Sequence, residues 1–357
     1  MENNTGEEYL KGRGAQYRSH NPYDKLHVVQ EHWEGLDEPL LDGKVPTQVF
    51  IEHPRTIVNK VDSADAGMLY SLNPYQGCEH GCIYCYARNS HEYWGYSAGL
   101  DFESKIMVKP DAPRLLREFL DKRSWQCTPI GLSGNTDCYQ PLENKYRITR
   151  QLLEVFLEYR NPVAMITKNR LILRDLDLLK QLAEKNLVHV MITVTSLNED
   201  LRLKMEPRTA AYAQRLKVIE ALAKANIPVG VMIAPIIPGL NSHEVPDVMK
   251  AAADAGARMA GYTVVRLNGS IQELFRDWLQ KNYPDRFNKV WKQIAALHGG
   301  QVNDSVLGRR MRGEGAVAES IAQLFRVSKK KYMGDKPPFT LNSGLFCRPV
   351  KGQIPLL

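Results

Sequence analysis

Three cysteines, Cys78, Cys82 and Cys85, form the pattern C-x-x-x-C-x-x-C within one short stretch of the chain. Thiolates spaced this closely are typical ligands of soft metals and of iron–sulfur clusters. A structural zinc site normally needs a fourth Cys or His ligand, and His80 lies between the first two cysteines. Three thiolates can instead hold three irons of a [4Fe-4S] cluster, which leaves the fourth iron open to a substrate or cofactor. The motif therefore predicts chemistry at a metal centre.

An aromatic residue, Tyr84, precedes the last cysteine and completes the pattern C-x-x-x-C-x-Φ-C. This pattern resembles the signature of radical S-adenosylmethionine (SAM) enzymes. The resemblance implies a [4Fe-4S] cluster held by Cys78, Cys82 and Cys85, with SAM bound to the open iron. It also implies that an electron from the cluster cleaves SAM to methionine and a 5′-deoxyadenosyl radical, which takes a hydrogen atom from the substrate. A zinc loop with His80, or three ordinary buried thiols, are the alternatives.

The composition is that of a globular chain with an extensive core, since 43% of its 357 residues are hydrophobic. The six cysteines are not expected to form a disulfide framework, because three of them are clustered. The N-terminus is polar, and the longest apolar stretch, 227–240, contains prolines and is too short to span a membrane. We therefore expect a cytoplasmic protein that does not enter a membrane.

Short β-branched apolar runs alternate with longer amphipathic stretches from residue 66 onward, as in repeated βα units. The predicted strands are Met68–Leu72, Ile130–Ser133, Val163–Thr167, Val188–Thr195, Val229–Ile233 and Tyr262–Val265. The predicted helices are Ala112–Leu120, Ile148–Tyr159, Leu176–Glu184, Ala213–Ala225 and Val245–Ala255. Six units in series predict a parallel sheet, either a partly closed barrel or an open doubly wound sheet. The resemblance favours the barrel, because radical SAM cores are partial (β/α)6 barrels whose cluster loop follows the first strand.

We therefore expect an α/β chain in three parts: an N-terminal extension over 1–65, the radical SAM barrel over 66–270, and a helical C-terminal extension with an irregular tail over 271–357. The helices predicted for the C-terminal extension are Gln272–Gln280, Phe287–Leu297 and Val317–Lys330. Functional residues of a parallel barrel lie on the loops at the carboxyl ends of its strands. Those loops are where binding residues are expected.

Candidate SAM-binding residues follow the second, fourth and fifth predicted strands. The small-residue stretch after the second strand consists of Ser133, Gly134, Asn135, Thr136 and Asp137. It resembles the glycine-rich motif that binds the SAM amino group in the superfamily. Thr195 and Ser196 offer hydroxyls for the SAM ribose or carboxylate, Arg208 offers a bidentate partner for the carboxylate, and the apolar backbone at Ala234 suits adenine. Helix capping, a surface ion pair for Arg208 and ordinary barrel packing are the alternative interpretations.

Four short strings resemble the spore photoproduct lyase group and its DNA repair photolyase-like relatives. They lie at 84–86, 135–137, 206–207 and 233–235, and the resemblance spans about residues 68–267. It implies a nucleic-acid substrate such as a damaged pyrimidine, and hydrogen transfer involving Tyr84 and Tyr86. A lyase cysteine that returns a hydrogen atom to the substrate radical is matched here by Gly134, which has no side chain to donate. Cys138 on the same loop is the predicted replacement, with an ordinary buried thiol as the alternative.

The formal net charge is +7, and the stretch 305–336 contains eight Lys or Arg residues against three acids. Such a stretch can contact nucleic-acid phosphates, although a solvated helix face is the more ordinary interpretation. The second partner expected is an electron donor of the flavodoxin or ferredoxin type. The leading hypothesis is a radical SAM enzyme that acts on nucleic acid, possessing lyase-type chemistry. A protein, peptide or small-metabolite substrate, and a non-catalytic iron–sulfur or zinc protein, are the alternatives.

Overall fold

A seven-stranded sheet lies at the centre of the computed structural model, which describes residues 10, 12–21, 45–63, 65, 67–335 and 339–349. Its strands are β2 (Val58–Lys60), β3 (Tyr70–Leu72), β6 (Ile130–Leu132), β7 (Val163–Thr167), β8 (Val188–Thr193), β9 (Val229–Ile236) and β10 (Met259–Val264). The order is β10-β9-β8-β7-β6-β3-β2, and every pair is parallel except β2 with β3. Because the parallel strands follow one another without reversal, the sheet is not doubly wound. The predicted α/β class is confirmed, with the strand order of a partial barrel.

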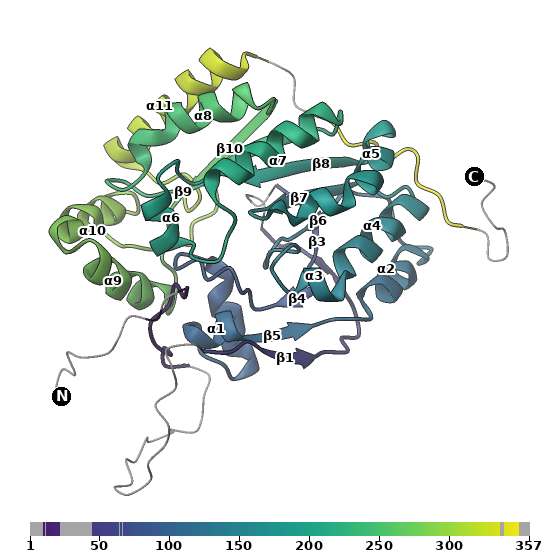
Figure 1. Cartoon of the computed structure of the whole chain (residues 1–357), viewed down its shortest axis with the longest axis horizontal. Helices are drawn as coiled ribbons and strands as arrows, with labels where there is room; N and C mark the ends of the chain where they lie inside the picture. Colours follow the sequence, from purple (N-terminus) through teal and green to yellow (C-terminus); the bar gives the residue numbers. More distant parts are fainter. Residues whose placement is uncertain are drawn as a thin grey trace, which may run out of the picture.

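Helices alternate with these strands and cover the outer face of the sheet (Figure 1). The helices that follow β5 to β9 are α2 (Ala112–Leu120), α3 (Glu143–Tyr146), α4 (Ile148–Glu158), α5 (Leu176–Glu184), α6 (Glu199–Met205), α7 (Tyr212–Lys224) and α8 (Val245–Asp254). The short 3-10 helices are η2 (Tyr86–Trp94), η3 (Arg170–Asp175), η4 (Ser242–Glu244) and η5 (Pro284–Arg286). The predicted α2 and α5 match residue for residue, and the other predicted helices of the barrel end within one residue of the observed ones.

A second, three-stranded sheet lies beside the loop that carries the cysteines (Figure 1). It consists of β1 (Gln48–Ile51), β5 (Lys105–Val108) and β4 (Tyr75–Gln76) in the order β1-β5-β4, with α1 (Leu100–Ser104) preceding β5. Two strands of the expected N-terminal extension thus join sheets: β1 joins the small sheet, and β2 forms the antiparallel edge of the large one. Residues 1–9, 11, 22–44 and 64 of that extension lie outside the described residues.

The C-terminal extension covers one edge of the large sheet. Its helices are α9 (Ile271–Asn282), α10 (Phe287–Ala296) and α11 (Gly315–Met333). The loop before α11 lies along β10, because the Val264 amide donates to the Met311 carbonyl at 3.0 Å. From this loop Arg310 reaches the segment that follows β2: its Nη2 lies 2.6 Å from Oδ1 of Asp65 and also donates to Ser63 Oγ. Side chains therefore connect the two edges of the large sheet, whose edge strands β10 and β2 are not paired with each other.

The described part of the C-terminal tail, 339–349, crosses the opposite end of the sheet, where the strands begin. The Asn342 amide donates to the Asn186 carbonyl at 2.9 Å, and the Cys347 amide donates to the Tyr159 carbonyl at 3.0 Å. Arg348 Nη2 donates to the Lys122 carbonyl at 2.8 Å. The tail thereby contacts the segments just after α5, α4 and α2.

Among the described helices, none combines the length and apolar character that a membrane span requires.

Candidate functional site

The three cysteines lie on the loop between β4 and η2, directly after the first parallel strand of the large sheet. The loop is held at both sides: the Cys78 amide donates to the Phe102 carbonyl at 2.9 Å, and the Ile83 amide donates to the Met205 carbonyl at 3.1 Å. Cys78 and Cys82 are each 7% exposed, and Cys85 is half-buried. All three thiols line one cavity of about 130 Å³. The structure thus brings the three predicted ligands together.

Most of the remaining cavity wall comes from the carboxyl ends of β6, β7 and β8. Ser133, Asn135, Thr136 and Asp137 contribute from the loop after β6, and Tyr86 contributes from η2. The remaining lining residues are His80, Phe102, Ile166, Thr167, Lys168 and Thr193. Parallel strands present functional residues at this end, and the predicted location of the site matches the position of the cavity.

The donor set fits a cluster of several metal atoms better than a single zinc ion. Among the described residues, no three His, Cys, Asp or Glu side chains converge closely enough to hold one ion. His80 has neighbours at both ring nitrogens, with Nδ1 3.4 Å from Asp137 Oδ2 and Nε2 3.3 Å from Asn169 Nδ2. Burial raises the pKa of the Cys82 thiol to about 12. Three thiolates in this buried cavity therefore need a strongly positive group, such as an iron–sulfur cluster, to offset their charge.

Asp137 joins the loop after β6 to the end of β7. Its Oδ1 accepts a hydrogen bond from Thr167 Oγ1 at 2.7 Å, and its Oδ2 accepts one from the Lys168 amide at 2.9 Å. The same Oδ2 faces the ring of His80 in the cysteine loop. Asp137 therefore fixes three segments of the cavity wall relative to one another, while remaining on the wall itself.

The small residues after β6 are held by β3, β4 and η2. Asn135 donates its amide to Asn73 Oδ1 at 2.8 Å, and Thr136 Oγ1 donates to the Tyr75 carbonyl at 2.7 Å. The Tyr86 hydroxyl donates to the Gly134 carbonyl. A Cβ on Gly134 would lie 2.9 Å from the Ser71 Cβ, closer than such atoms normally approach. Glycine at position 134 is therefore required by the packing of β3 under this loop.

Cys138 is one of the predicted site residues that the structure does not bring to the cavity. Its side chain is fully buried in the main hydrophobic core and does not line the cavity. Its carbonyl accepts a hydrogen bond from Thr149 Oγ1 at 2.6 Å. Tyr86, in contrast, lines the cavity and is 50% exposed. The hydrogen-donor role of Cys138 stays a prediction, and Tyr86 has the more direct access to the cavity.

The predicted SAM-binding residues after β8 and β9 contact protein groups instead of the cavity. Thr195 Oγ1 donates to Glu206 Oε1 at 2.8 Å and lies 3.3 Å from the Ala234 carbonyl oxygen. The other two interactions are Ser196 Oγ with Glu244 Oε1 at 2.8 Å and Arg208 Nη2 with Glu79 Oε1 at 3.2 Å. None of Thr195, Ser196, Arg208 and Ala234 lines the cavity. Their contacts with other protein groups hold the loops around the site in place.

A buried carboxylate, Glu206, anchors Tyr84. The Tyr84 hydroxyl donates to Glu206 Oε1, and Arg215 Nη2 lies 2.5 Å from Glu206 Oε2. Burial by itself would raise the pKa of Glu206, but the charges of Arg215 and Lys168 and the hydrogen bond from Tyr84 outweigh it and hold this pKa at about 2. The aromatic residue of the cysteine motif is thus tied through its hydroxyl to an ionised carboxylate on the segment after α6.

Lys168 is a site residue that the sequence analysis missed. It follows β7 directly, lines the cavity, and has its Nζ 5.4 Å from the centre of the Tyr84 ring. Burial opposes its charge, but Cys82 and Glu206 outweigh burial and raise the pKa of Lys168 above its ordinary value. A cation therefore lies in the same cavity as the three thiols. Its place immediately after a predicted strand was the signal that could have identified it.

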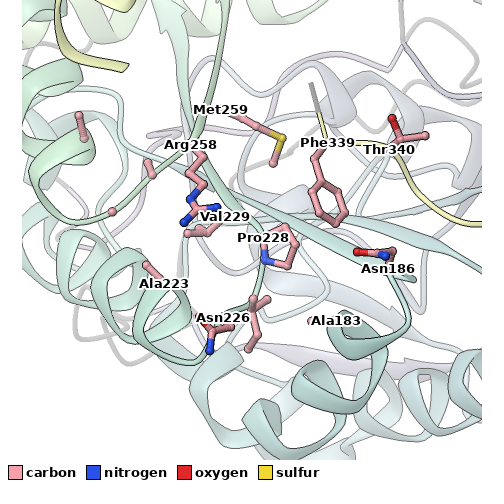
Figure 2. Close-up of a pocket in the computed structure, with 14 residues that line it drawn as sticks. Ala183, Asn186, Ala223, Asn226, Pro228, Val229, Arg258, Met259, Phe339 and Thr340 are labelled. Atoms are coloured by element: carbon pink, nitrogen blue, oxygen red, sulfur yellow. The ribbon is translucent and has the colours of Figure 1, made fainter. Parts of the chain in front are cut away.

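A second, larger cavity of about 750 Å³ lies at the other end of the sheet (Figure 2). It is lined by residues at the beginning of β9 and β10, among them Pro228, Val229 and Met259, and by Phe339 of the C-terminal tail. None of the three motif cysteines lines it. Because parallel α/β sheets bind ligands beyond the carboxyl ends of their strands, the smaller cavity is the candidate active site.

The basic stretch 305–336 is divided between internal contacts and an outer helix. Arg309 pairs with Asp304 at 2.5 Å, and Arg312 lies over the Tyr262 ring with its Cζ 4.1 Å from the ring centre. The basic residues of α11 are Arg326, Lys329, Lys330 and Lys331, and Lys336 lies outside the described residues. Helix α11 starts near the carboxyl end of β10, packs along α8 and leads toward Phe339 at the opposite end. Its basic end is therefore remote from the candidate active site.

Several known proteins are similar to this chain in sequence. Residues 72–252 match the model of the Radical SAM superfamily. An uncharacterised protein of Mycobacterium tuberculosis is 31% identical over 247 residues, which cover 67% of this chain and 72% of that protein. An uncharacterised protein of Methanocaldococcus jannaschii is 28% identical over 229 residues, covering 64% and 82% of the two chains. A radical SAM Nalpha-GlyT isomerase of Pseudomonas phage M6 is 27% identical over 173 residues, covering 48% and 34%.

The fold is also similar to a solved structure. Spore photoproduct lyase complexed with dinucleoside spore photoproduct superposes with a TM-score of 0.59 over 80% of each chain, at 15% sequence identity. At this identity the similarity establishes the shared fold. The family match covers the strands and loops that form the thiol cavity, and the large sheet has the strand order expected of that fold. The chain is therefore a member of the radical SAM superfamily, whose enzymes use SAM and an iron–sulfur cluster.

Proposed function

We propose that this radical SAM enzyme binds a [4Fe-4S] cluster through Cys78, Cys82 and Cys85 and holds SAM beside the cluster, at the carboxyl ends of the strands. The observation that carries the proposal is the single cavity lined by all three thiols and by Lys168 at the carboxyl ends of the strands. When bound, the cluster and SAM supply a reducing electron and a 5′-deoxyadenosyl radical that abstracts hydrogen from the substrate.

Residues of the chain orient SAM in this cavity. The ammonium of Lys168 pairs with the SAM carboxylate, because it is the cation on the wall beside the thiols. Ser133, Asn135 and Thr136 offer polar groups from the loop after β6, and Thr193 offers one from the end of β8. Asp137 holds the loop after β6 against the end of β7, because it accepts hydrogen bonds from Thr167 and Lys168. Thr195, Ser196, Arg208 and Ala234 support these loops from outside the cavity.

The substrate proposed is a nucleic acid that carries a modified or damaged pyrimidine. The similarity in fold to spore photoproduct lyase, solved with a dinucleoside spore photoproduct, supports this substrate class. The half-exposed ring of Tyr86 at the cavity supports it too, because aromatic side chains stack on unpaired bases. Tyr86 would also transfer hydrogen to or from the substrate, and Tyr84 and Cys138 are the other candidates for this transfer.

The experiment that tests the cofactor assignment is anaerobic reconstitution of the full chain. We expect about four irons per chain, an electron paramagnetic resonance signal of the reduced protein that changes when SAM is added, and 5′-deoxyadenosine after dithionite reduction. Cys82→Ala should lose all three, whereas Cys127→Ala, a cysteine outside the cavity, should keep them. Tight binding of one zinc with no response to SAM would overturn the proposal.

The experiment that tests the substrate class uses single-stranded DNA that carries ultraviolet lesions. Single-stranded DNA with ultraviolet lesions should bind with an affinity that falls steeply as salt is raised. Mass spectrometry should then detect a SAM-dependent change in the lesion. Equal consumption of SAM with and without the DNA, together with salt-independent binding, would direct the search to peptide or metabolite substrates.

A further inference from the structure

A short N-terminal segment packs directly against the loop that carries the cysteines. We refer to this segment, residues 12–21, as the N-terminal arm. Its Arg13, Ala15 and Ser19 are buried. A Cβ on Gly14 would lie only 1.8 Å from the carbonyl oxygen of Gly81, which precedes Cys82. The backbones of the arm and the cysteine loop are therefore in contact at a position where no side chain fits.

A buried carboxylate connects the arm to the rest of the site. Glu103, at the end of α1, is fully buried. Its Oε2 accepts a hydrogen bond from the Gly14 amide at 3.1 Å, and its Oε1 accepts one from the Ala15 amide at 2.8 Å. Arg13 Nη1 donates to the Glu103 carbonyl at 2.6 Å. The arm thus supplies donors that a buried charge requires.

Arg88 extends this contact to the second cysteine. Its Nη2 lies 2.5 Å from Glu103 Oε1, and its Nε donates to the Cys82 carbonyl at 2.9 Å. Its Nη1 donates to the carbonyls of Ala98 and Gly99 at 3.0 Å each. The side chain is fully buried. Because the guanidinium is a rigid plane, its orientation toward Cys82 depends on where Glu103 is held.

We propose that the N-terminal arm is a positioning element of the metal centre, which acts on the Cys82 backbone through Glu103 and Arg88. This inference rests on the proposed function, because it assumes that Cys82 is a cluster ligand. Hydrogen bonds and charges around the sulfur ligands tune the potential and retention of an iron–sulfur cluster. The arm amides offset part of the negative charge of Glu103, so an attached arm favours the reduced cluster. Displacing the arm leaves that charge less compensated and Arg88 less firmly oriented.

The variant that displaces the arm is Gly14→Ala, because its methyl group meets backbone atoms of Gly81. The control is Arg18→Gln in the same arm, because the exposed Arg18 side chain pairs with Asp101 and does not contact Glu103. After reconstitution of both full-length variants, we expect Gly14→Ala to lose iron in air about tenfold faster than wild type, in keeping with the loss of hydrogen bonds to a buried charge. We also expect a more negative midpoint potential of its cluster. The control should match wild type in both measurements.

A second variant tests the same contact in case the first variant does not fold. Arg13→Ala removes the donor to the Glu103 carbonyl without adding a clash, and it should shift iron retention and potential in the same direction. Circular dichroism of each metal-free variant reports whether it folds. Wild-type iron retention and potential in Gly14→Ala and Arg13→Ala would overturn the role of the arm while leaving the cluster assignment intact. A wild-type protein that binds no iron would instead overturn the proposed function itself.

Discussion

Arg215 and Glu206 form an ion pair in which Nη2 and Oε2 lie 2.5 Å apart and both side chains are fully buried. The pair lies beneath Tyr84, whose hydroxyl donates to the same carboxylate. A buried pair of this kind is costly to break, because the remaining partner is left charged and uncompensated. It therefore links the stability of the barrel to the aromatic residue of the cysteine motif.

The first prediction concerns the pH dependence that this pair creates. The pKa of Glu206 is lowered from 4.5 to about 2 in the folded protein. A depressed carboxyl pKa contributes stability that is fully present above the unfolded-state pKa and is lost as pH falls from about 5 toward about 2. In urea unfolding of the metal-free protein, this contribution to the free energy of unfolding is on the order of 3 kcal/mol. Glu206→Gln should flatten this part of the pH profile, and the exposed control Glu220→Gln should retain it.

The second prediction concerns Lys168, the cation on the cavity wall. Lys168→Met should weaken SAM binding by about tenfold to a hundredfold, the effect of losing one hydrogen bond to a charged group. Iron content should not change, because Lys168 is not a cluster ligand. Lys224→Met, at an exposed position on α7, is the control. Equilibrium dialysis with labelled SAM measures the affinity, and an unchanged affinity would remove Lys168 from the SAM site.

The third prediction concerns the packing under Gly134. The Cβ that Gly134→Cys adds would lie 2.9 Å from the Ser71 Cβ. Because this distance is too short, we expect a loss of about 1–3 kcal/mol in the free energy of unfolding. Ser71→Gly in the same chain should recover most of that loss. A double-mutant cycle from urea unfolding measures the coupling. Additive effects of the two substitutions would show that Ser71 is not what requires glycine at position 134.

The fourth prediction compares two candidates for hydrogen transfer. Tyr86→Phe removes a hydroxyl that lies at the cavity, whereas Cys138→Ala removes a thiol that is buried in the core. With a DNA lesion as substrate, we expect Tyr86→Phe to reduce product yield while SAM cleavage continues. Cys138→Ala should lower the free energy of unfolding by about 1–2 kcal/mol with little effect on yield. Abortive products from Cys138→Ala alone would restore the thiol as the donor.

The regular part of the fold was predictable because its signals are local. In β7 the residues alternate between buried and half-buried positions, and α5 has a clear apolar face, so both match the predicted bounds residue for residue. Strand β1 was missed because it has only four residues and its apolar residues, Val49, Phe50 and Ile51, do not alternate with polar ones. Met259 and Ala260, which begin β10, lack β-branching, and the predicted strand started later.

The candidate site was predictable where one short motif contains it, as with the three cysteines. Roles that depend on distant partners could not be read from the sequence. Arg208 pairs with Glu79, and Ser196 pairs with Glu244, so neither is available to the cavity. Glu103 and Ala15, which form one of the contacts with the arm, are 88 residues apart in the sequence. In the sequence, the signal that distinguishes Lys168 is its place immediately after a predicted strand.

The Arg310 connection between the two edges of the large sheet has a mechanical consequence. A closed barrel keeps a fixed circumference, because widening it would require two strands to separate along their whole length. Here, among the described residues, contacts of Arg310 with Asp65 and Ser63 join the two edges, and the Gly308 amide also donates to Asp65 Oδ2 at 3.2 Å. These contacts are hydrogen bonds and an ion pair, so their loss would leave every strand pair of the large sheet intact. The seam between β10 and β2 therefore depends on side-chain and loop contacts where a closed barrel would have a strand pair.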